Sequence, residues 1–65
     1  MEYSNSRMTE IIEEYIHDKR DRSIMTERMI DNKTIEKLAE DHELSVSQVK
    51  RIIKKHWDTI FRHLS

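Results

Sequence analysis

The 65-residue chain contains no cysteine, no glycine and no proline, and each absence excludes a class of site. Without cysteine there is no disulfide framework, no thiolate metal centre and no cysteine nucleophile. Without glycine there is no glycine-rich loop that cradles phosphates, and without proline no residue breaks a helix. No run approaches the roughly 18 apolar residues that span a bilayer, and residues 1–6 lack the apolar segment of a secretory signal. We therefore expect a cytoplasmic domain with no membrane partner.

Charge is distributed unevenly along the chain, although the formal net charge is only −1. Residues 1–44 hold seven Lys and Arg against twelve Asp and Glu, whereas residues 45–65 hold five against one. Such asymmetry within one small domain suggests a polyanionic partner for the basic part. A basic C-terminal helix also complements its own dipole, so charge alone does not establish that partner.

Apolar periodicity predicts an all-α fold with one four-helix domain over residues 1–65. Apolar residues recur at helical spacing throughout the first helix, and this spacing is interrupted by polar residues after it. The interruption predicts two separate helices here. Ser6 and Asp21 are the expected N-caps of these two helices. The predicted helices cover residues 7–17, 21–30, 34–42 and 46–64.

The connections between the later helices carry residues suited to tight turns and helix caps. Asn32 tolerates the left-handed backbone conformation better than other residues except glycine, and Thr34 is the expected cap of the third helix. Glu43 lies in the next turn, where a left-handed conformation would cost roughly 1 kcal/mol. Residues 45–48, Ser-Val-Ser-Gln, fit a capping box that opens the fourth helix.

On a helical wheel the fourth helix divides into an apolar arc and a basic ridge. We expect Trp57 to be the largest single anchor of the core, with Phe61 at the edge of the arc. Stacking of either ring on nucleic-acid bases is the alternative. The apolar arc comprises Val46, Val49, Ile52, Ile53, Trp57, Ile60, Phe61 and Leu64, and the basic ridge comprises Lys50, Arg51, Lys54, Lys55 and Arg62.

The third helix, a short connection and the fourth helix together predict a helix-turn-helix motif. Ala39 is small where the two helices must cross closely, and Leu44, Val49 and Ile52 are apolar where they pack. The alternative is a plain corner of a helical bundle with a solvated basic face. The capping box, the packing residues and the charge asymmetry agree with one another, and this agreement favours the motif.

A helix that enters the major groove of DNA presents its first turns to the edges of the bases. Gln can bond adenine through two hydrogen bonds, and Arg or Lys can bond guanine. Basic residues further along such a helix suit phosphates. The predicted DNA-binding residues are therefore Ser47, Gln48, Lys50 and Arg51 for bases, and Lys54, Lys55 and Arg62 for phosphates.

Two segments, IDNKTIEKLAE at 30–40 and LSVSQVKRI at 44–52, resemble region 4 of sigma-70-family sigma factors and related small regulators, many of them from phages of Gram-positive bacteria. The resemblance implies a supporting helix, then the two helices of the motif, and it carries the family's base-reading positions onto the four residues named above. Glu43 stands where the family usually has glycine, and His42 where it usually has a branched aliphatic residue. A chain of this length has no room for the domain with which a sigma factor binds core polymerase, so a small regulator is implied.

These observations predict a sequence-specific double-stranded DNA-binding protein that acts in transcriptional control, of phage or prophage type. A single DNA-binding domain of this size buries little surface on DNA. We therefore expect a homodimer or a further partner. One alternative is a protein-interaction module that contacts RNA polymerase or another regulator. Another is an accessory in DNA packaging or recombination.

Enzymatic and metal-dependent functions are not expected. His56 and His63 lie on one flank of the apolar arc, but two ligands do not make a zinc site, so we expect partly buried histidines and no cofactor. Glu13, Glu14 and Asp18 have the pattern of a solvated face and not of an acid–base pair. No nucleophile–base constellation is visible in the sequence.

Overall fold

The computed structural model describes residues 5–64 and confirms the all-α, four-helix fold, with no strand in that range. The helices are α1 (Asn5–Tyr15), α2 (Lys19–Met29), α3 (Ile35–Asp41) and α4 (Val46–Leu64). The bounds of α4 are those predicted, whereas α1 and α2 each begin two residues earlier than expected.

Both expected caps of the first two helices are wrong. Ser6 lies inside α1, which begins at Asn5. Asp18, and not Asp21, caps α2, since its side chain accepts a hydrogen bond of 3.0 Å from the backbone N–H of Asp21. That hydrogen bond also lowers the pKa of Asp18, because it stabilises the charged carboxylate.

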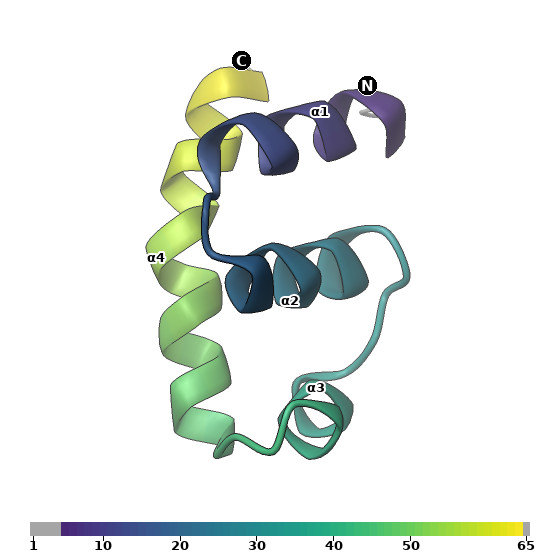
Figure 1. The fold of residues 1–65 in the computed structure, drawn as a ribbon, viewed down its shortest axis with the longest axis vertical. Helices are drawn as coiled ribbons and strands as arrows, with labels where there is room; N and C mark the ends of the chain where they lie inside the picture. The colour runs from purple at the N-terminus through teal and green to yellow at the C-terminus, as the bar shows by residue number, and fades with distance from the viewer. Residues whose placement is uncertain (1–4, 65) are drawn as a thin grey trace.

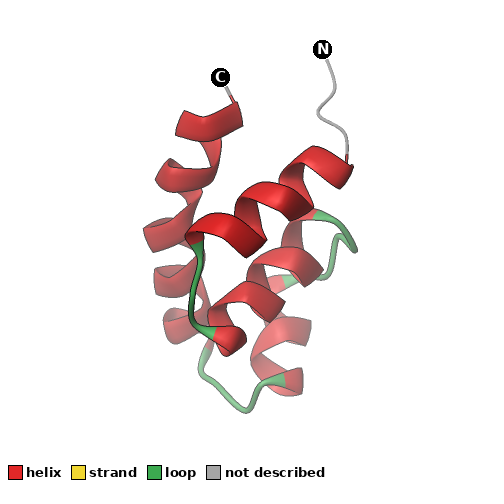
Figure 2. Cartoon of the chain, turned by 45° about the horizontal axis from the view of Figure 1, so that its top comes forward, coloured by secondary structure: helices red, strands yellow, loops and turns green. Residues whose placement is uncertain are grey.

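The three shorter helices lie one after another along α4 and run across it (Figure 1). Each of them contacts α4, and short connections join successive helices (Figure 2). The helix α4 is therefore the common surface against which the other three pack.

The core consists of two clusters that meet on α4, where half-buried Ile53 packs against both. A fully buried aliphatic side chain contributes about 1.5–3 kcal/mol relative to an exposed one. Both clusters therefore hold the short helices onto α4. One comprises Ile11, Ile12, Ile16, Met25 and Ile60, and the other comprises Ile24, Leu38, Ala39, Val49 and Ile52.

The expectation that Trp57 anchors the core is wrong, because 42% of this residue is exposed. Val46, from the same apolar arc, is 36% exposed, and Tyr15 of α1 is 39% exposed. The short helices cover the middle of the arc, where Val49 and Ile60 are fully buried. One edge of the apolar arc is consequently left uncovered.

The turn between α3 and α4 contains a residue in the left-handed conformation, the case for which the sequence predicted strain. Glu43 has a φ of 56°, and Asn32 in the preceding connection has a φ of 59°. The backbone N–H of Leu44 donates to the carbonyl of Ala39 at 2.9 Å, and the N–H of Glu43 donates to that of Glu40 at 3.3 Å. This is the Schellman arrangement that usually ends on glycine, here completed by a glutamate.

Exposure of Trp57 predicts that its truncation is tolerated. We expect Trp57→Ala to remain folded and to lose about 1–2 kcal/mol, because much of the indole is already in water. Ile60→Ala removes a side chain that is fully buried, and we expect it to lose about 2–5 kcal/mol. Thermal unfolding followed by circular dichroism checks both values. Equal destabilisation by the two variants would contradict the exposed placement of Trp57.

The conformation of Glu43 predicts the effect of glycine at that position. Glu43→Gly relieves roughly 1 kcal/mol of strain and adds entropy to the unfolded chain, so stability should rise or stay unchanged. Glu40→Gly, inside α3, is the matched control and should lose about 1 kcal/mol. Chemical denaturation compares them. A loss above about 1 kcal/mol for Glu43→Gly would show that Glu43 is not left-handed in solution.

Candidate nucleic-acid interface

The start of α4 is held by the predicted capping box. The side-chain oxygen of Ser45 accepts from the backbone N–H of Gln48 at 3.1 Å, and Oε1 of Gln48 accepts from the N–H of Ser45 at 2.9 Å. Thr34 caps α3 as expected, accepting from the N–H of Lys37 at 3.1 Å. These contacts define the orientation of the first turn of α4, which carries the predicted base-reading residues.

The capping box limits what Gln48 can do toward DNA. A two-bond contact with adenine uses both the oxygen and the nitrogen of the side-chain amide. Oε1 of Gln48 is already bonded to the N–H of Ser45. This bond fixes the orientation of the amide, so it restricts such a contact even though the oxygen has a second lone pair.

All seven predicted DNA-binding residues lie exposed on α4. They divide between two flanks of the helix. Lys50 and Lys54 line a hollow of about 350 Å³ together with residues of α2 and α3. Gln48 and Arg51 line another hollow, of about 150 Å³, on the side where α2 begins. Arg62 lies about 17 Å beyond Arg51 along the helix axis, at about 1.5 Å per residue.

Arg20 belongs to this surface, and reasoning from the sequence missed it. It lines the hollow that also contains Gln48 and Arg51, and its side chain is 53% exposed. Its guanidinium lies 3.4 Å from Oδ1 of Asp21, which partly offsets its charge. The basic run Lys19-Arg20 with Arg22 could have indicated this residue. Charge counted over residues 1–44 as a whole is acidic, and that total does not show the local run.

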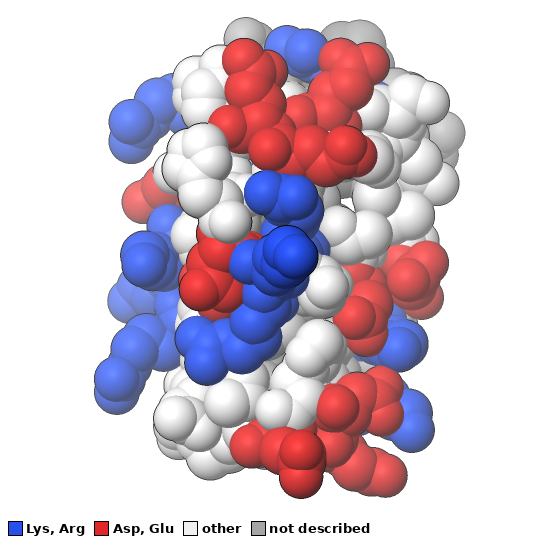
Figure 3. Space-filling model, viewed as in Figure 1, with Lys and Arg blue, Asp and Glu red and all other residues white. Residues whose placement is uncertain are grey.

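Positive and negative side chains gather on different helices of the molecule. Figure 3 shows Lys and Arg along the α4 side and across the middle of this face, with Asp and Glu over α1 at the top and beside α3 at the lower right. Exposed acids include Glu10, Glu13 and Glu14 of α1 and Glu36, Glu40 and Asp41 of α3, while the exposed Asp58 interrupts the basic ridge of α4. A polyanion is therefore drawn to the side of α4 and repelled from α1.

A buried polar contact sets the position of α2 on α4. Nε2 of His56 lies 2.8 Å from Oδ2 of Asp21, and the two side chains are 13% and 8% exposed. Asp21 thus serves this contact and not the cap predicted for it. The link places Arg20, the neighbour of Asp21, beside Arg51.

His56 and His63 are half-buried, as the sequence predicted. His56 bonds to Asp21, and the ring of His63 stacks on Tyr15 with centroids 3.8 Å apart. Among residues 5–64, the structure gathers no group of three His, Asp or Glu side chains that could hold a metal ion.

A cluster of charged residues, which we call the α2–α3 clasp, joins α2 to α3. Nζ of Lys33 lies 2.8 Å from Oε1 of Glu27 and 3.2 Å from Oδ2 of Asp41, and Nε2 of His42 lies 3.2 Å from Oε2 of Glu27. Hydrogen bonds from Lys33 lower the pKa of Glu27 and of Asp41, while Glu27 and then Asp41 raise the pKa of Lys33. The clasp holds the end of α3, from which the turn to α4 departs.

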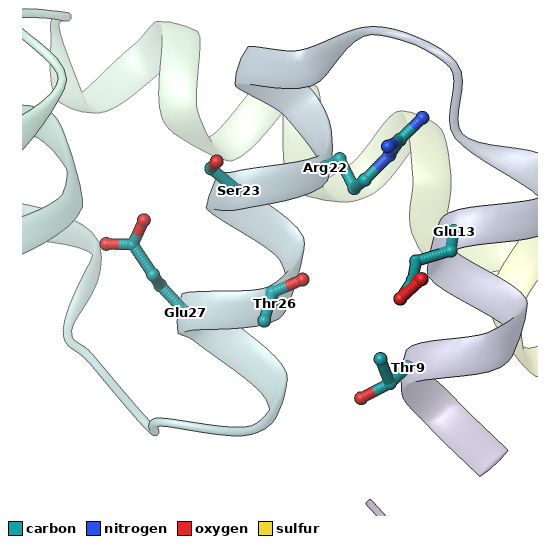
Figure 4. A pocket seen from close by; sticks show the side chains of 6 residues that line it. All are labelled: Thr9, Glu13, Arg22, Ser23, Thr26 and Glu27. Atoms are coloured by element: carbon teal, nitrogen blue, oxygen red, sulfur yellow. The ribbon is translucent and has the colours of Figure 1, made fainter. Parts of the chain in front are cut away.

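Another hollow, of about 470 Å³, opens between α1 and α2 (Figure 4). Thr9 and Glu13 of α1 face Thr26 of α2 across it, while Glu27 turns away from them. Nε of Arg22 donates to the carbonyl of Ile16 at 3.0 Å, so this guanidinium is bound to the backbone. The described lining contains two carboxylates, and its one guanidinium is bound to the backbone, so the hollow does not favour a polyanion.

Comparisons with known proteins add no further constraint. No protein-family model, curated protein or solved structure matches the chain. In the part of the chain that the structure describes, every helix is too short or too polar to cross a membrane. Functional inference consequently rests on the geometry of the basic surface.

The α2–α3 clasp predicts how stability depends on pH. Because the pKa values of Glu27 and Asp41 are lowered, their contribution is present at neutral pH and is lost as the pH falls below the ordinary carboxyl value of about 4. Lys33, whose pKa is raised by Glu27 and then Asp41, stays protonated throughout this acid range, but its ion pairs are lost when these carboxylates become protonated. We expect the free energy of unfolding to fall as the pH drops below about 5 and then through the lowered pKa values of Glu27 and Asp41.

Glu27→Gln should flatten this acid dependence, whereas Glu14→Gln removes an equal charge from an exposed site on α1 and serves as the control. Urea denaturation at a series of pH values measures both. If Glu27→Gln and Glu14→Gln give the same pH profile, the clasp does not contribute to stability.

Proposed function

We propose that this protein binds double-stranded DNA through α4 and acts as a small transcriptional regulator of phage or prophage type. The observation that carries the proposal is the exposed basic ridge of α4, which begins at a capped N-terminus beside α3 and is extended by Arg20 of α2. In this role α3 and α4 are the two helices of a helix-turn-helix motif, and α4 is the recognition helix. DNA binding would place the protein in the cytoplasm.

The shape of α4 suits the major groove. The groove is about 12 Å wide and admits one α-helix. The helix spans about 28 Å at about 1.5 Å per residue, and its first turns project Ser47, Lys50 and Arg51 into solvent. We assign base contacts to these three residues. Phosphate contacts are assigned to Arg20, Lys54, Lys55 and Arg62.

The packing between α3 and α4 supports the motif. Ala39 is 6% exposed and Val49 is fully buried, so the two helices approach closely through a small and a branched residue. Leu44 of the turn packs against the same cluster. The turn therefore holds α3 against the inner face of α4 and leaves its outer face free for DNA.

The resemblance to region 4 of sigma factors is consistent with this assignment and supplies the suggestion of transcriptional control. A single reader of this size buries little surface on DNA, so we expect a dimer or a further protein on the same site. Contact with RNA polymerase is one form that such a partner would take. An accessory role in DNA packaging or recombination would use the same basic surface.

The assignments predict two kinds of variant. Arg51→Ala should lose about 1–3 kcal/mol on the preferred site and little on random duplex, because it removes a base contact. The double variant Lys54→Ala, Lys55→Ala should weaken binding to every duplex. The slope of the logarithm of the binding constant against the logarithm of the salt concentration should decrease in magnitude by about two units. Arg20→Ala should remove a single phosphate contact and so reduce the magnitude of the same slope by about one unit.

The measurement is titration of fluorescent duplexes at several salt concentrations, with the preferred site first selected from a random duplex pool. Arg7→Ala, which removes from α1 one charge and its hydrogen bond of 3.3 Å to the carbonyl of His63, is the control for a cation outside the basic ridge and should bind as the unaltered protein does. No duplex binding above background at about 50 mM salt would refute the proposed function. A preference that survives Arg51→Ala would refute the major-groove assignment.

A further inference from the structure

The uncovered edge of the apolar arc forms a surface that DNA binding does not explain. Trp57, 42% exposed, lies between two hollows of about 350 and 260 Å³. The ring of Phe61 packs against the indole with centroids 4.6 Å apart and so supports it from one side. Trp57 is the only tryptophan of the chain, and tryptophan is among the residues that most often dominate protein interfaces.

The two hollows combine an apolar floor with a cationic rim. Ile35, Ile53 and Trp57 provide the floor of the larger hollow, and Lys50 and Lys54 stand at its rim. Arg28 borders both hollows. Its Nη1 donates to the carbonyl of Lys33 at 2.8 Å, which holds the guanidinium in place. None of the described residues that line either hollow is acidic.

The apolar floor and the cationic rim together limit which molecules could bind over Trp57. A second copy of this chain, bound symmetrically, would bring Arg28, Lys50 and Lys54 against the same three cations of its partner. A small ligand needs a pocket that buries most of its surface, whereas these hollows lie open on the side of α4. An apolar side chain from another protein would pack on the apolar floor, and carboxylates on either side of it would pair with the cations of the rim.

We propose that Trp57 and its two hollows are a docking site for an acidic segment of another protein, in which one large apolar side chain inserts beside the indole. Lys50 and Lys54 belong to this site and also to the basic ridge of α4. A partner bound at the docking site therefore makes Lys50 and Lys54 unavailable to DNA, so the partner and the duplex compete for these two residues. The competition rests on the proposed DNA binding, whereas the docking site does not.

Selection from a phage-displayed library of random peptides tests the docking site without assuming a partner sequence. We expect the enriched peptides to place an aromatic or large aliphatic residue between Asp or Glu residues. Binding of one synthesised peptide should shift the emission of Trp57, the single indole reporter. Absence of an enriched class, or enrichment of peptides without acidic residues, would overturn the proposal.

Matched variants separate docking from nonspecific charge attraction. Trp57→Ala should weaken binding of the enriched peptide about thirtyfold or more, the loss typical of a central interface residue. Tyr15→Ala, which removes another exposed aromatic residue, should leave binding unchanged. Equal binding by Trp57→Ala and the unaltered protein would overturn the proposal. So would a dimer in sedimentation equilibrium that Trp57→Ala abolishes.

The last experiment separates the two proposals. A labelled duplex is titrated with the enriched peptide, and we expect the peptide to displace the duplex. A control peptide with Asn and Gln in place of Asp and Glu should not displace it. Simultaneous binding of peptide and duplex would overturn the competition. If no duplex binds but the peptide still requires Trp57, DNA binding fails and the docking site stands.

Discussion

The structure depends on the burial of one apolar arc on one long helix. The helices α1, α2 and α3 have 11, 11 and 7 residues, and isolated helices of such lengths are marginal in water. They persist because Ile12, Ile24 and Leu38 are buried in the clusters that include Val49 and Ile60 of α4. Loss of the arc would therefore remove the support of all three helices together.

Polar contacts then determine how the short helices are oriented on α4. The Asp21–His56 contact, at 2.8 Å, holds the start of α2 beside the middle of α4. The α2–α3 clasp holds the end of α3, and the capping box holds the first residues of α4. Hydrophobic burial is not directional, so these hydrogen bonds supply the direction that it lacks. Through them the outer face of the first turns of α4 remains exposed to solvent.

The surface that remains on α4 has two different chemical characters. Its outer face carries the cations from Lys50 to Arg62, interrupted by Asp58, and one flank is apolar around Trp57. Lys50 and Lys54 lie where these two surfaces meet. A small domain has little surface to divide between partners, so a shared boundary of this kind couples the binding of one partner to the binding of the other. Under the two proposals, competition for Lys50 and Lys54 would need no conformational change.

Features that depend on neighbouring residues could be predicted from the sequence. Interactions that span a few residues determine the bounds of α4, its capping box, the cap at Thr34 and the left-handed Asn32. The exposure of the basic ridge follows equally from the helical period. Local chemistry was sufficient in each case.

Only the tertiary structure decided which part of the apolar arc is covered. A helical wheel gives the direction of Trp57 but not the width of the surface that α2 and α3 cover, because that width depends on how they cross α4. The same long-range packing brought Arg20 beside Arg51 and turned Asp21 from a cap into the partner of His56. The sequence alone determined the helices and their charged faces. The crossing of the helices determined which side chains share a surface, since those side chains lie far apart along the chain.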